Sequence, residues 1–399
     1  MRYLFFFFMV LTLWGGGHVY MGRRLIEASG LQGARQKAAW ALLTSMAILT
    51  LLVLVLERAV GLSEALSPLL WAAYIYMGFI VLVLLGVLLR DLGLLLGRIG
   101  VRLVRLVQRE RAKEAPGGQE VVHSRRAFLM GLTNAGIVGA SGVMSAVGFA
   151  QARRAPALIE VDVPVKGLHP DLDGLRVAQV SDLHVGPTIR ADFVRRVVEV
   201  TNAARPDLVA ITGDLVDGLV ADRRPDVAPL ADLLAPLGVF YVTGNHEYYW
   251  GVHAWIEEVA RLGFKPLINA HALVERGAGR LLVAGVTDYR EGQRAGQPSD
   301  PGAALKGAPE AHARILLAHQ PRSVFEAARQ GFDLQLSGHT HGGQFVPWNF
   351  LVWLAQPFNA GLHLFEGMWI YVSRGTGYWG PPQRFGVPPE VTVLTLRAA

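Results

Sequence analysis

The sequence predicts an all-α membrane region over residues 1–156, followed by an α/β domain over residues 157–399. The 399-residue chain is 52% hydrophobic and only 18% charged, whereas an ordinary soluble protein is about 25% charged. Its net charge of +6 divides into +10 for the first region and −4 for the second. After residue 157, short β-rich segments alternate with helical patterns, which is typical of α/β layers.

Composition also limits the kinds of partner and site. The chain contains no cysteine, which excludes disulfides, thiolate metal ligands and cysteine nucleophiles. The excess of basic charge lies entirely in the apolar region. We therefore expect the lipid bilayer to be a partner and expect no nucleic-acid binding, and the sequence identifies no protein partner.

Four apolar stretches are predicted to cross a membrane, because about 20 helical residues span its hydrocarbon core. The first is interrupted by three consecutive glycines, and the other three contain no charged residue. The four stretches are residues 3–21, 38–56, 68–89 and 128–150.

The basic residues between these stretches predict the orientation. Four lie in residues 22–37 and nine in residues 90–126, but only Arg58 lies in residues 57–67. Basic connections face the cytoplasm. We therefore expect a multi-pass protein of the cytoplasmic (inner) membrane, with residues 157–399 on the extracytoplasmic side.

Two basic segments each have two interpretations. In residues 92–107, Leu and Ile recur every three or four positions with arginines between them. That segment is either an interfacial helix on an anionic leaflet or a helical extension of the third crossing. Residues 124–129, SRRAFL, resemble a twin-arginine export signal, or are juxtamembrane arginines before an ordinary anchor. Either interpretation of SRRAFL sends the C-terminal half outward.

The α/β domain is predicted from the period of its apolar residues. Helices are expected at residues 191–204, 227–234, 254–262 and 323–330. Strands are expected at residues 175–180, 208–211, 239–242, 280–286, 315–318, 334–336, 369–372 and 391–396.

Polar segments follow five of these strands directly. Because ligand sites in α/β sheets form at the carboxyl ends of strands, we expect the segments to meet. Their Asp, Asn and His side chains are donors that suit divalent first-row metals. The segments are DLH at 182–184, GD at 213–214, GNHE at 244–247, HQ at 319–320 and GHTH at 338–341.

In this order the five segments resemble the calcineurin-like metallophosphoesterase superfamily. The sequence around these segments is similar to the bacterial membrane-associated YkuE/YaeI-like branch of that superfamily. The similar stretches are VAQVSDLHVGPTI, PDLVAITGDLVDG, GVFYVTGNHEYY and LSGHTHGGQ. The resemblance covers residues 157–399 and implies a four-layer α/β/β/α sandwich around two mixed sheets.

The resemblance also implies a binuclear site for divalent ions, with Mn, Fe, Zn, Co and Ni as candidates. The reaction it implies is attack of a metal-bridging hydroxide on a phosphate ester or pyrophosphate bond. One metal would be bound by Asp182, His184 and His341, the second by Asn245, His319 and His339, and both by Asp214.

His246 is implied to be catalytic without binding metal. It would lie near the leaving-group oxygen, as a general acid or as a transition-state donor. We expect Glu247, on the next position, to orient its imidazole. For Arg374, contact with the substrate phosphate and a structural role at a strand end are both expected alternatives.

An aromatic-rich segment follows the last ligand motif. Trp348, Phe350 and Trp353 are expected to bind an acyl chain or to enter the bilayer interface. The alternative is that such residues fill space between the final strands, which we favour for Trp369 and Tyr371.

Three functions remain open from the sequence. The leading one is a membrane-anchored binuclear phosphoesterase, for which a lipid-linked phosphate or pyrophosphate is the preferred substrate. The second is a tethered phosphodiesterase or nucleotidase for soluble extracytoplasmic substrates. The third is a transport or signalling protein whose phosphoesterase domain is regulatory or inactive. Against transport, the predicted crossings contain no ionisable residue other than His18.

Overall fold

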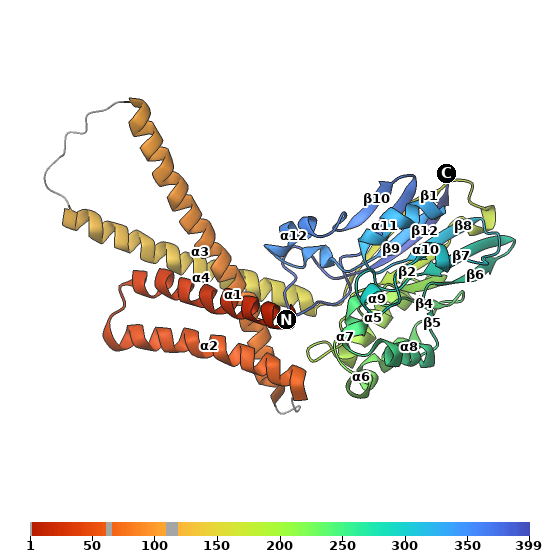
Figure 1. The fold of residues 1–399 in the computed structure, drawn as a ribbon, viewed down its shortest axis with the longest axis horizontal. Helices are drawn as coiled ribbons and strands as arrows, with labels where there is room; N and C mark the ends of the chain where they lie inside the picture. The colour runs from red at the N-terminus through yellow and green to blue at the C-terminus, as the bar shows by residue number, and fades with distance from the viewer. Residues whose placement is uncertain (1, 61–65, 109–118) are drawn as a thin grey trace. The chain divides into compact units, whose positions relative to one another are not determined.

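The structure is a computed structural model that describes residues 2–60, 66–108 and 119–399. The chain separates into two compact units, Met1–Val147 and Gly148–Ala399. Figure 1 shows the helices of the first unit in red to yellow and the mixed α/β second unit in yellow to blue.

The described part of the first unit is helical. Its helices are α1 (Arg2–Leu25), α2 (Gly33–Val60), α3 (Ser67–Gln108) and α4 (Gln119–Arg153), which runs on into the second unit. Among the described residues, three segments are long and apolar enough to cross a membrane: Gly33–Glu57, Ser67–Val104 and Phe128–Arg153. The first predicted crossing, residues 3–21, lies in α1. The structure describes the backbone of residues 2–10 but not their side chains, so part of this crossing lies outside the described residues.

The two ambiguous basic segments both lie in long helices. Residues 92–107 continue α3 without a break, as the helical-extension interpretation expects. The SRRAFL segment lies within α4. Polar contacts tie α1 to α3: Tyr20 donates to a carboxylate oxygen of Asp91 at 2.6 Å, and Arg24 pairs with the same carboxylate at 2.7 Å. Paired polar groups of this kind stabilise helix packing in an apolar solvent.

The first sheet of the second unit has the order β1-β12-β2-β3-β4-β5. β12 is antiparallel to β2, and the other neighbours are parallel. Its strands are β1 (Ala157–Val165), β2 (Arg176–Val180), β3 (Leu208–Ile211), β4 (Val239–Tyr241), β5 (Lys265–Pro266) and β12 (Glu390–Ala398).

The second sheet has the order β10-β11-β9-β8-β7-β6, with antiparallel pairs only at its two edges. Both sheets are therefore mixed. Its strands are β6 (Ala270–Arg276), β7 (Gly279–Gly285), β8 (Ala313–Leu317), β9 (Leu334–Ser337), β10 (Gly361–Phe365) and β11 (Met368–Val372).

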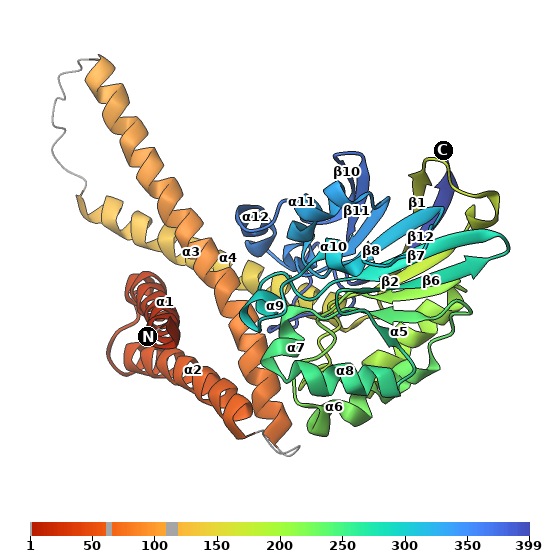
Figure 2. The same cartoon turned by 45° about the vertical axis from the view of Figure 1, so that its right-hand side comes forward.

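Alternating side chains place one core between the sheets and one on each outer face. In β2, Val177 joins the core shared by both sheets, whereas Ala178 joins the core under helices. Figure 2 shows helices on both outer sides of the paired sheets. The predicted four-layer α/β/β/α sandwich is thus confirmed. The helices are α5 (Ala191–Ala203), α6 (Val220–Val227), α7 (Asn245–Tyr249), α8 (Val252–Arg261), α9 (Glu291–Arg294), α10 (Pro301–Ala304), α11 (Val324–Ala327) and α12 (Trp348–Leu351).

Two predicted helices are wrong in position or extent. The helix expected at residues 227–234 lies earlier, in α6, and is followed by a 3-10 turn, Ala228–Asp232, that has proline near its start. Proline lacks the amide proton that an α-helical ladder needs. The helix expected at 323–330 is reduced to α11, flanked by 3-10 turns. Strands β1, β5, β6 and β10 were not predicted, and all four lie at or beside a sheet edge.

Candidate metal centre

The five polar segments converge at the carboxyl ends of β2, β3, β4, β8 and β9. The first group joins Asp182, His184 and His341. The Nε2 atoms of His184 and His341 lie 3.0 Å apart, and Nε2 of His341 lies 3.3 Å from Oδ1 of Asp182. All three side chains are buried. Ring nitrogens and a carboxylate oxygen that face one another at such distances are suited to share one cation.

The second group joins Asp214, His319 and His339. Nε2 of His319 lies 3.2 Å from Oδ2 of Asp214 and 3.2 Å from Nδ1 of His339. His319 donates from Nδ1 to the carbonyl of Thr212 at 2.8 Å. That hydrogen bond fixes the ring and directs Nε2 toward the group, as in histidines that bind metals.

Asp214 belongs to the second group and also faces a histidine of the first. Its Oδ2 atom is 3.2 Å from His319 and 3.9 Å from Nε2 of both His184 and His246. Burial raises the pKa of Asp214, but the imidazoles of His319 and His246 outweigh burial and hold that pKa well below its usual range. An ionised carboxylate in this place suits a ligand shared by two cations.

Asn245 provides a test of whether a metal fits the cluster. Its side chain is buried, yet its Oδ1 atom accepts no hydrogen bond from the residues that the structure describes. A buried amide oxygen without a partner costs about 1–3 kcal/mol, which a cation would remove. The residues present therefore fit divalent ions.

Backbone conformation at the cluster is unusual for residues with side chains. Left-handed conformations are uncommon outside glycine and concentrate at functional sites. Five candidate ligands, in the turns after β2, β3 and β9, have φ values between 50° and 70°. These turns therefore hold the ligands in conformations that cost backbone strain. The left-handed candidates are Asp182, His184, Asp214, His339 and His341.

Gly338 lies too close to Asp182 for a larger residue to replace it. A Cβ atom on Gly338 would lie 2.1 Å from Oδ2 of Asp182 and 2.0 Å from Oγ of Ser181. The next amide, that of His339, donates to both carboxylate oxygens of Asp182, at 2.8 and 3.0 Å. The missing side chain thus lets the backbone orient this carboxylate.

Asp217 is a site residue that the sequence analysis missed. His246 donates from Nδ1 to Oδ1 of Asp217 at 2.5 Å, and His184 donates from Nδ1 to Oδ2 at 3.1 Å. Burial raises the pKa of Asp217, but the imidazoles of His246 and His184 outweigh it and lower that pKa. The only sequence signal was its place in ITGDLVDG, three residues after Asp214.

The expectation that Glu247 orients His246 is wrong. Its buried carboxylate accepts instead from three backbone amides, those of Gly244 at 2.6 Å, Leu215 at 2.7 Å and Asp214 at 3.1 Å. Glu247 therefore ties the turn after β4 to the turn after β3. The orienting partner of His246 is Asp217, which comes from the neighbouring strand end.

Two arginines lie near the cluster with different surroundings. Arg374 pairs with Glu390 at 2.9 Å, which gives it the structural partner of the second interpretation. Arg384 is fully buried, and its guanidinium lies 3.1 Å from Nδ1 of His341. The backbone amide of Arg384 donates to the carbonyl of Gly148 in α4 at 3.0 Å. Arg384, which contacts His341, is therefore also bonded to the end of α4.

An exposed apolar patch follows the last ligand segment. We call it the α12 patch, and its side chains are between 43% and 83% exposed. By contrast, Tyr371 is buried in the core between the sheets, as expected. The α12 patch comprises Trp348, Phe350, Leu351, Trp353 and Leu354.

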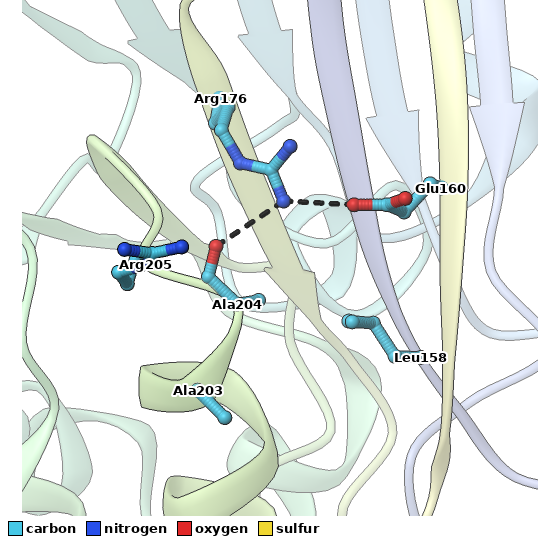
Figure 3. A pocket seen from close by; sticks show the side chains of 6 residues that line it. All are labelled: Leu158, Glu160, Arg176, Ala203, Ala204 and Arg205. Carbon is cyan, nitrogen blue, oxygen red and sulfur yellow. Dashed lines mark hydrogen bonds and ion pairs between the residues drawn. The ribbon is translucent and has the colours of Figure 1, made fainter.

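A separate open pocket of about 500 Å³ lies at the opposite end of β2. In it Arg176 donates to Glu160 at 2.9 Å and to the carbonyl of Ala204 at 3.2 Å (Figure 3). Because Arg176 begins β2 whereas Asp182 follows its end, this pocket is not part of the candidate metal centre. Its lining residues are Leu158, Glu160, Arg176, Ala203, Ala204 and Arg205.

The sequence model of the calcineurin-like phosphoesterase family matches residues 175–343. That range contains all seven candidate ligands and also His246 and Asp217. It ends just before the α12 patch, so the patch and the helical first unit lie outside the matched part of the chain.

Three relatives extend the comparison. A bovine (Bos taurus) protein named transmembrane protein with metallophosphoesterase domain is 40% identical over 64% of this chain and 61% of its own length. An uncharacterized metallophosphoesterase of Aquifex aeolicus is 37% identical over 56% of this chain and 85% of its own. The uncharacterized metallophosphoesterase YkuE of Bacillus subtilis is 29% identical over 69% and 98%. The chain thus spans about three fifths of the bovine relative, and the match with YkuE confirms the resemblance predicted from the motifs.

Proposed function

This chain belongs to the calcineurin-like metallophosphoesterase family, and from that premise we propose that it hydrolyses a phosphate ester or pyrophosphate bond at the cluster centred on Asp214. The family is metal-dependent, and the Asp and His groups of this chain are suited to hold metal ions. The observation that carries the proposal is the place of Asp214, whose Oδ2 atom faces histidines of both groups at 3.2 and 3.9 Å.

Seven side chains would hold two divalent ions. We propose that Asp214 contacts both and that Mn, Fe, Zn, Co and Ni are the candidate metals. When bound, such ions neutralise charge on a phosphate and lower the pKa of a bound water toward neutrality. The remaining ligands divide as Asp182, His184 and His341 on one ion, and Asn245, His319 and His339 on the other.

His246 is the proposed proton donor to the leaving-group oxygen. Burial lowers its pKa, but the carboxylates of Asp214 and Asp217 outweigh burial and raise the pKa of His246 to about 9. The carboxylate of Asp217 accepts a hydrogen bond from Nδ1 of His246, which leaves Nε2 free to donate a proton. The backbone amide of His246 donates to Oδ1 of Asp214 at 2.8 Å, which fixes the imidazole beside the proposed bridging ligand.

We propose a lipid-linked phosphate or pyrophosphate as the substrate. Membrane association is supported by the apolar helices and by the name of the bovine relative. The α12 patch begins a few residues after His341 and exposes two tryptophans and a phenylalanine. Exposed aromatic residues of this kind are suited to contact acyl chains or a bilayer interface.

The proposed location is the cytoplasmic membrane, crossed several times, with the catalytic unit on the extracytoplasmic side. The distribution of basic residues between the apolar stretches supports this orientation. Reporter fusions at residues 115 and 399 test it, because a cytoplasmic signal from residue 399 would contradict it.

The catalytic proposal is tested with the full chain in lipid nanodiscs supplied with Mn²⁺. We expect hydrolysis of bis-p-nitrophenyl phosphate by the wild type and its loss in Asp214→Ala. Folding of the variant is checked by circular dichroism. A folded Asp214→Ala protein that keeps full activity would contradict the proposed role of the cluster.

A further inference from the structure

Two exposed aromatic rings pack against His246. The ring centroid of Tyr249 lies 5.3 Å from that of His246, and the centroid of Trp379 lies 5.7 Å from it, both in edge-to-face geometry. We propose that Trp379 and Tyr249 form a subsite for an apolar leaving group. This inference rests on the proposed function, and it specifies what that function acts on.

Both rings are exposed although they pack against a buried histidine. Tyr249 is 47% exposed and Trp379 is 57% exposed, although both touch a histidine that is buried beside the cluster. Aromatic side chains gain free energy when their surface is removed from water. Rings that contact His246 and remain half-exposed therefore offer apolar surface for a ligand.

Trp379 is held in place by the segment that carries the last ligands. The side chain of Gln344, which is buried, accepts from the amide of Trp379 at 2.9 Å and donates to its carbonyl at 2.9 Å. It also donates to the carbonyl of Pro381 at 3.2 Å. Gln344 lies three residues after His341, so the cluster and the tryptophan share one support. Fixing a binding residue before the ligand arrives lowers the entropic cost of binding.

The chemistry of the reaction places the leaving group beside these rings. In hydrolysis the bond between phosphorus and the leaving-group oxygen breaks, and a bond from phosphorus to the oxygen of a water forms as that water releases one proton to solvent. The departing oxygen takes up one proton. We have proposed that His246 supplies that proton. The first atoms beyond the oxygen must then lie next to His246, where Tyr249 and Trp379 pack. A leaving group that is apolar at those atoms would cover both rings.

The inference is tested by binding rather than by turnover. Methylphosphonate and benzylphosphonate share the phosphonate group, but only benzylphosphonate carries a ring beyond the position of the leaving-group oxygen. Their Kd values are measured by isothermal titration calorimetry with the metal-loaded full chain in nanodiscs. We expect benzylphosphonate to bind the wild type about 3- to 10-fold more tightly, as an added aromatic contact would give. We expect that advantage to disappear in Trp379→Ala.

Butylphosphonate separates two forms of the same apolar chemistry. If it gains as much as benzylphosphonate, the subsite accepts flexible hydrocarbon, and if only benzylphosphonate gains, the subsite selects flat rings. Both outcomes support an apolar subsite. Phe325→Ala is the matched control, because Phe325 is 44% exposed and packs against Phe365. Trp379→Phe is the second variant should Trp379→Ala not fold, and it should retain part of the advantage.

Three results would overturn the inference in distinguishable ways. An unchanged advantage in folded Trp379→Ala, with normal methylphosphonate binding, rejects the subsite alone. Equal weakening of both phosphonates in Trp379→Ala assigns Trp379 to positioning His246 and also rejects the subsite. Failure of the metal-loaded wild type to bind any phosphonate, together with no hydrolysis, rejects the proposed function on which the subsite rests.

Discussion

One carboxylate, that of Asp217, binds His246 at 2.5 Å through its Oδ1 atom. Its Oδ2 atom accepts from Nδ1 of His184 at 3.1 Å. The proposed proton donor and a proposed metal ligand are therefore oriented by the same side chain. Both hydrogen bonds use Nδ1, so both rings direct Nε2 toward Asp214.

Replacing Asp217 by Asn should lower kcat, because an amide cannot fix the protonated Nδ1 atoms of both His184 and His246. Losses of about 10- to 100-fold are typical when such an orienting partner is removed. Steady-state kinetics with bis-p-nitrophenyl phosphate and metal analysis of the same samples measure the effect. Asp222→Asn is the control, since Asp222 is exposed on α6. Wild-type kcat in Asp217→Asn would contradict the orienting role.

Gly338→Ala should reduce metal binding, because its Cβ atom would lie 2.1 Å from Oδ2 of Asp182. Either Asp182 or the turn after β9 must move. We expect lower metal content per chain, measured by inductively coupled plasma mass spectrometry on folded protein. Gly302→Ala is a suitable control, since the nearest atom to its Cβ would lie 3.3 Å away. Equal metal content in the two variants would show that the close approach does not matter for binding.

The pair of arginines around Glu258 predicts a dependence of stability on pH. Glu258 is buried and pairs with Arg261 at 2.6 Å and with Arg224 at 3.0 Å. The hydrogen bond from Arg261, and then that from Arg224, lower the pKa of Glu258 below its usual 4.5. A lowered pKa in the folded state adds stability above pH 4.5 that is lost as the pH falls through the folded-state value.

Glu258→Gln should therefore lower the melting temperature at pH 7, and the difference from wild type should shrink below about pH 4. Because both arginines are half-exposed, water screens these ion pairs and we expect a difference of only a few degrees in melting temperature. Thermal unfolding followed by circular dichroism gives the two melting temperatures. Glu257→Gln, on the exposed side of α8, is the control. A difference that stays constant from pH 7 to pH 3.5 would contradict the ion-pair explanation.

Polar substitutions in the α12 patch should change substrate preference. A protein with Trp348→Ser, Phe350→Ser and Trp353→Ser should show a lower ratio of kcat/KM for a lipid phosphate in vesicles to kcat/KM for bis-p-nitrophenyl phosphate. Loss of the three aromatic contacts predicts a fall of about tenfold or more. Exposed leucines elsewhere, Leu219 and Leu234, provide a matched serine control. An unchanged ratio would favour a soluble substrate.

The sequence predicted the parts of the site that depend on position along a strand. Each candidate ligand directly follows a strand, so a strand prediction also places the ligand at the edge of a sheet. The structure accordingly brings Asp182, His184 and His341 within one group, although 157 residues separate His341 from His184.

The sequence could not predict features that depend on turn conformation or on distant pairing. Asp214 has a left-handed backbone, and Asp217, three residues later in the same turn, is the residue that pairs with His246. Trp379 lies 35 residues from Gln344, and no local pattern indicates their contact. β1 was missed because its partner is the final strand, β12, and its outward side chains are exposed.

We propose that phosphoester hydrolysis depends on divalent ions held by the cluster around Asp214. The most direct measurement is the hydrolysis of bis-p-nitrophenyl phosphate by the full chain in nanodiscs before chelation, after chelation, and after Mn²⁺ is restored, with bound metal determined at each stage. We predict that activity disappears with the metal and returns with it in the wild type but not in Asp214→Ala. Full activity in protein with no detectable bound metal would contradict the account.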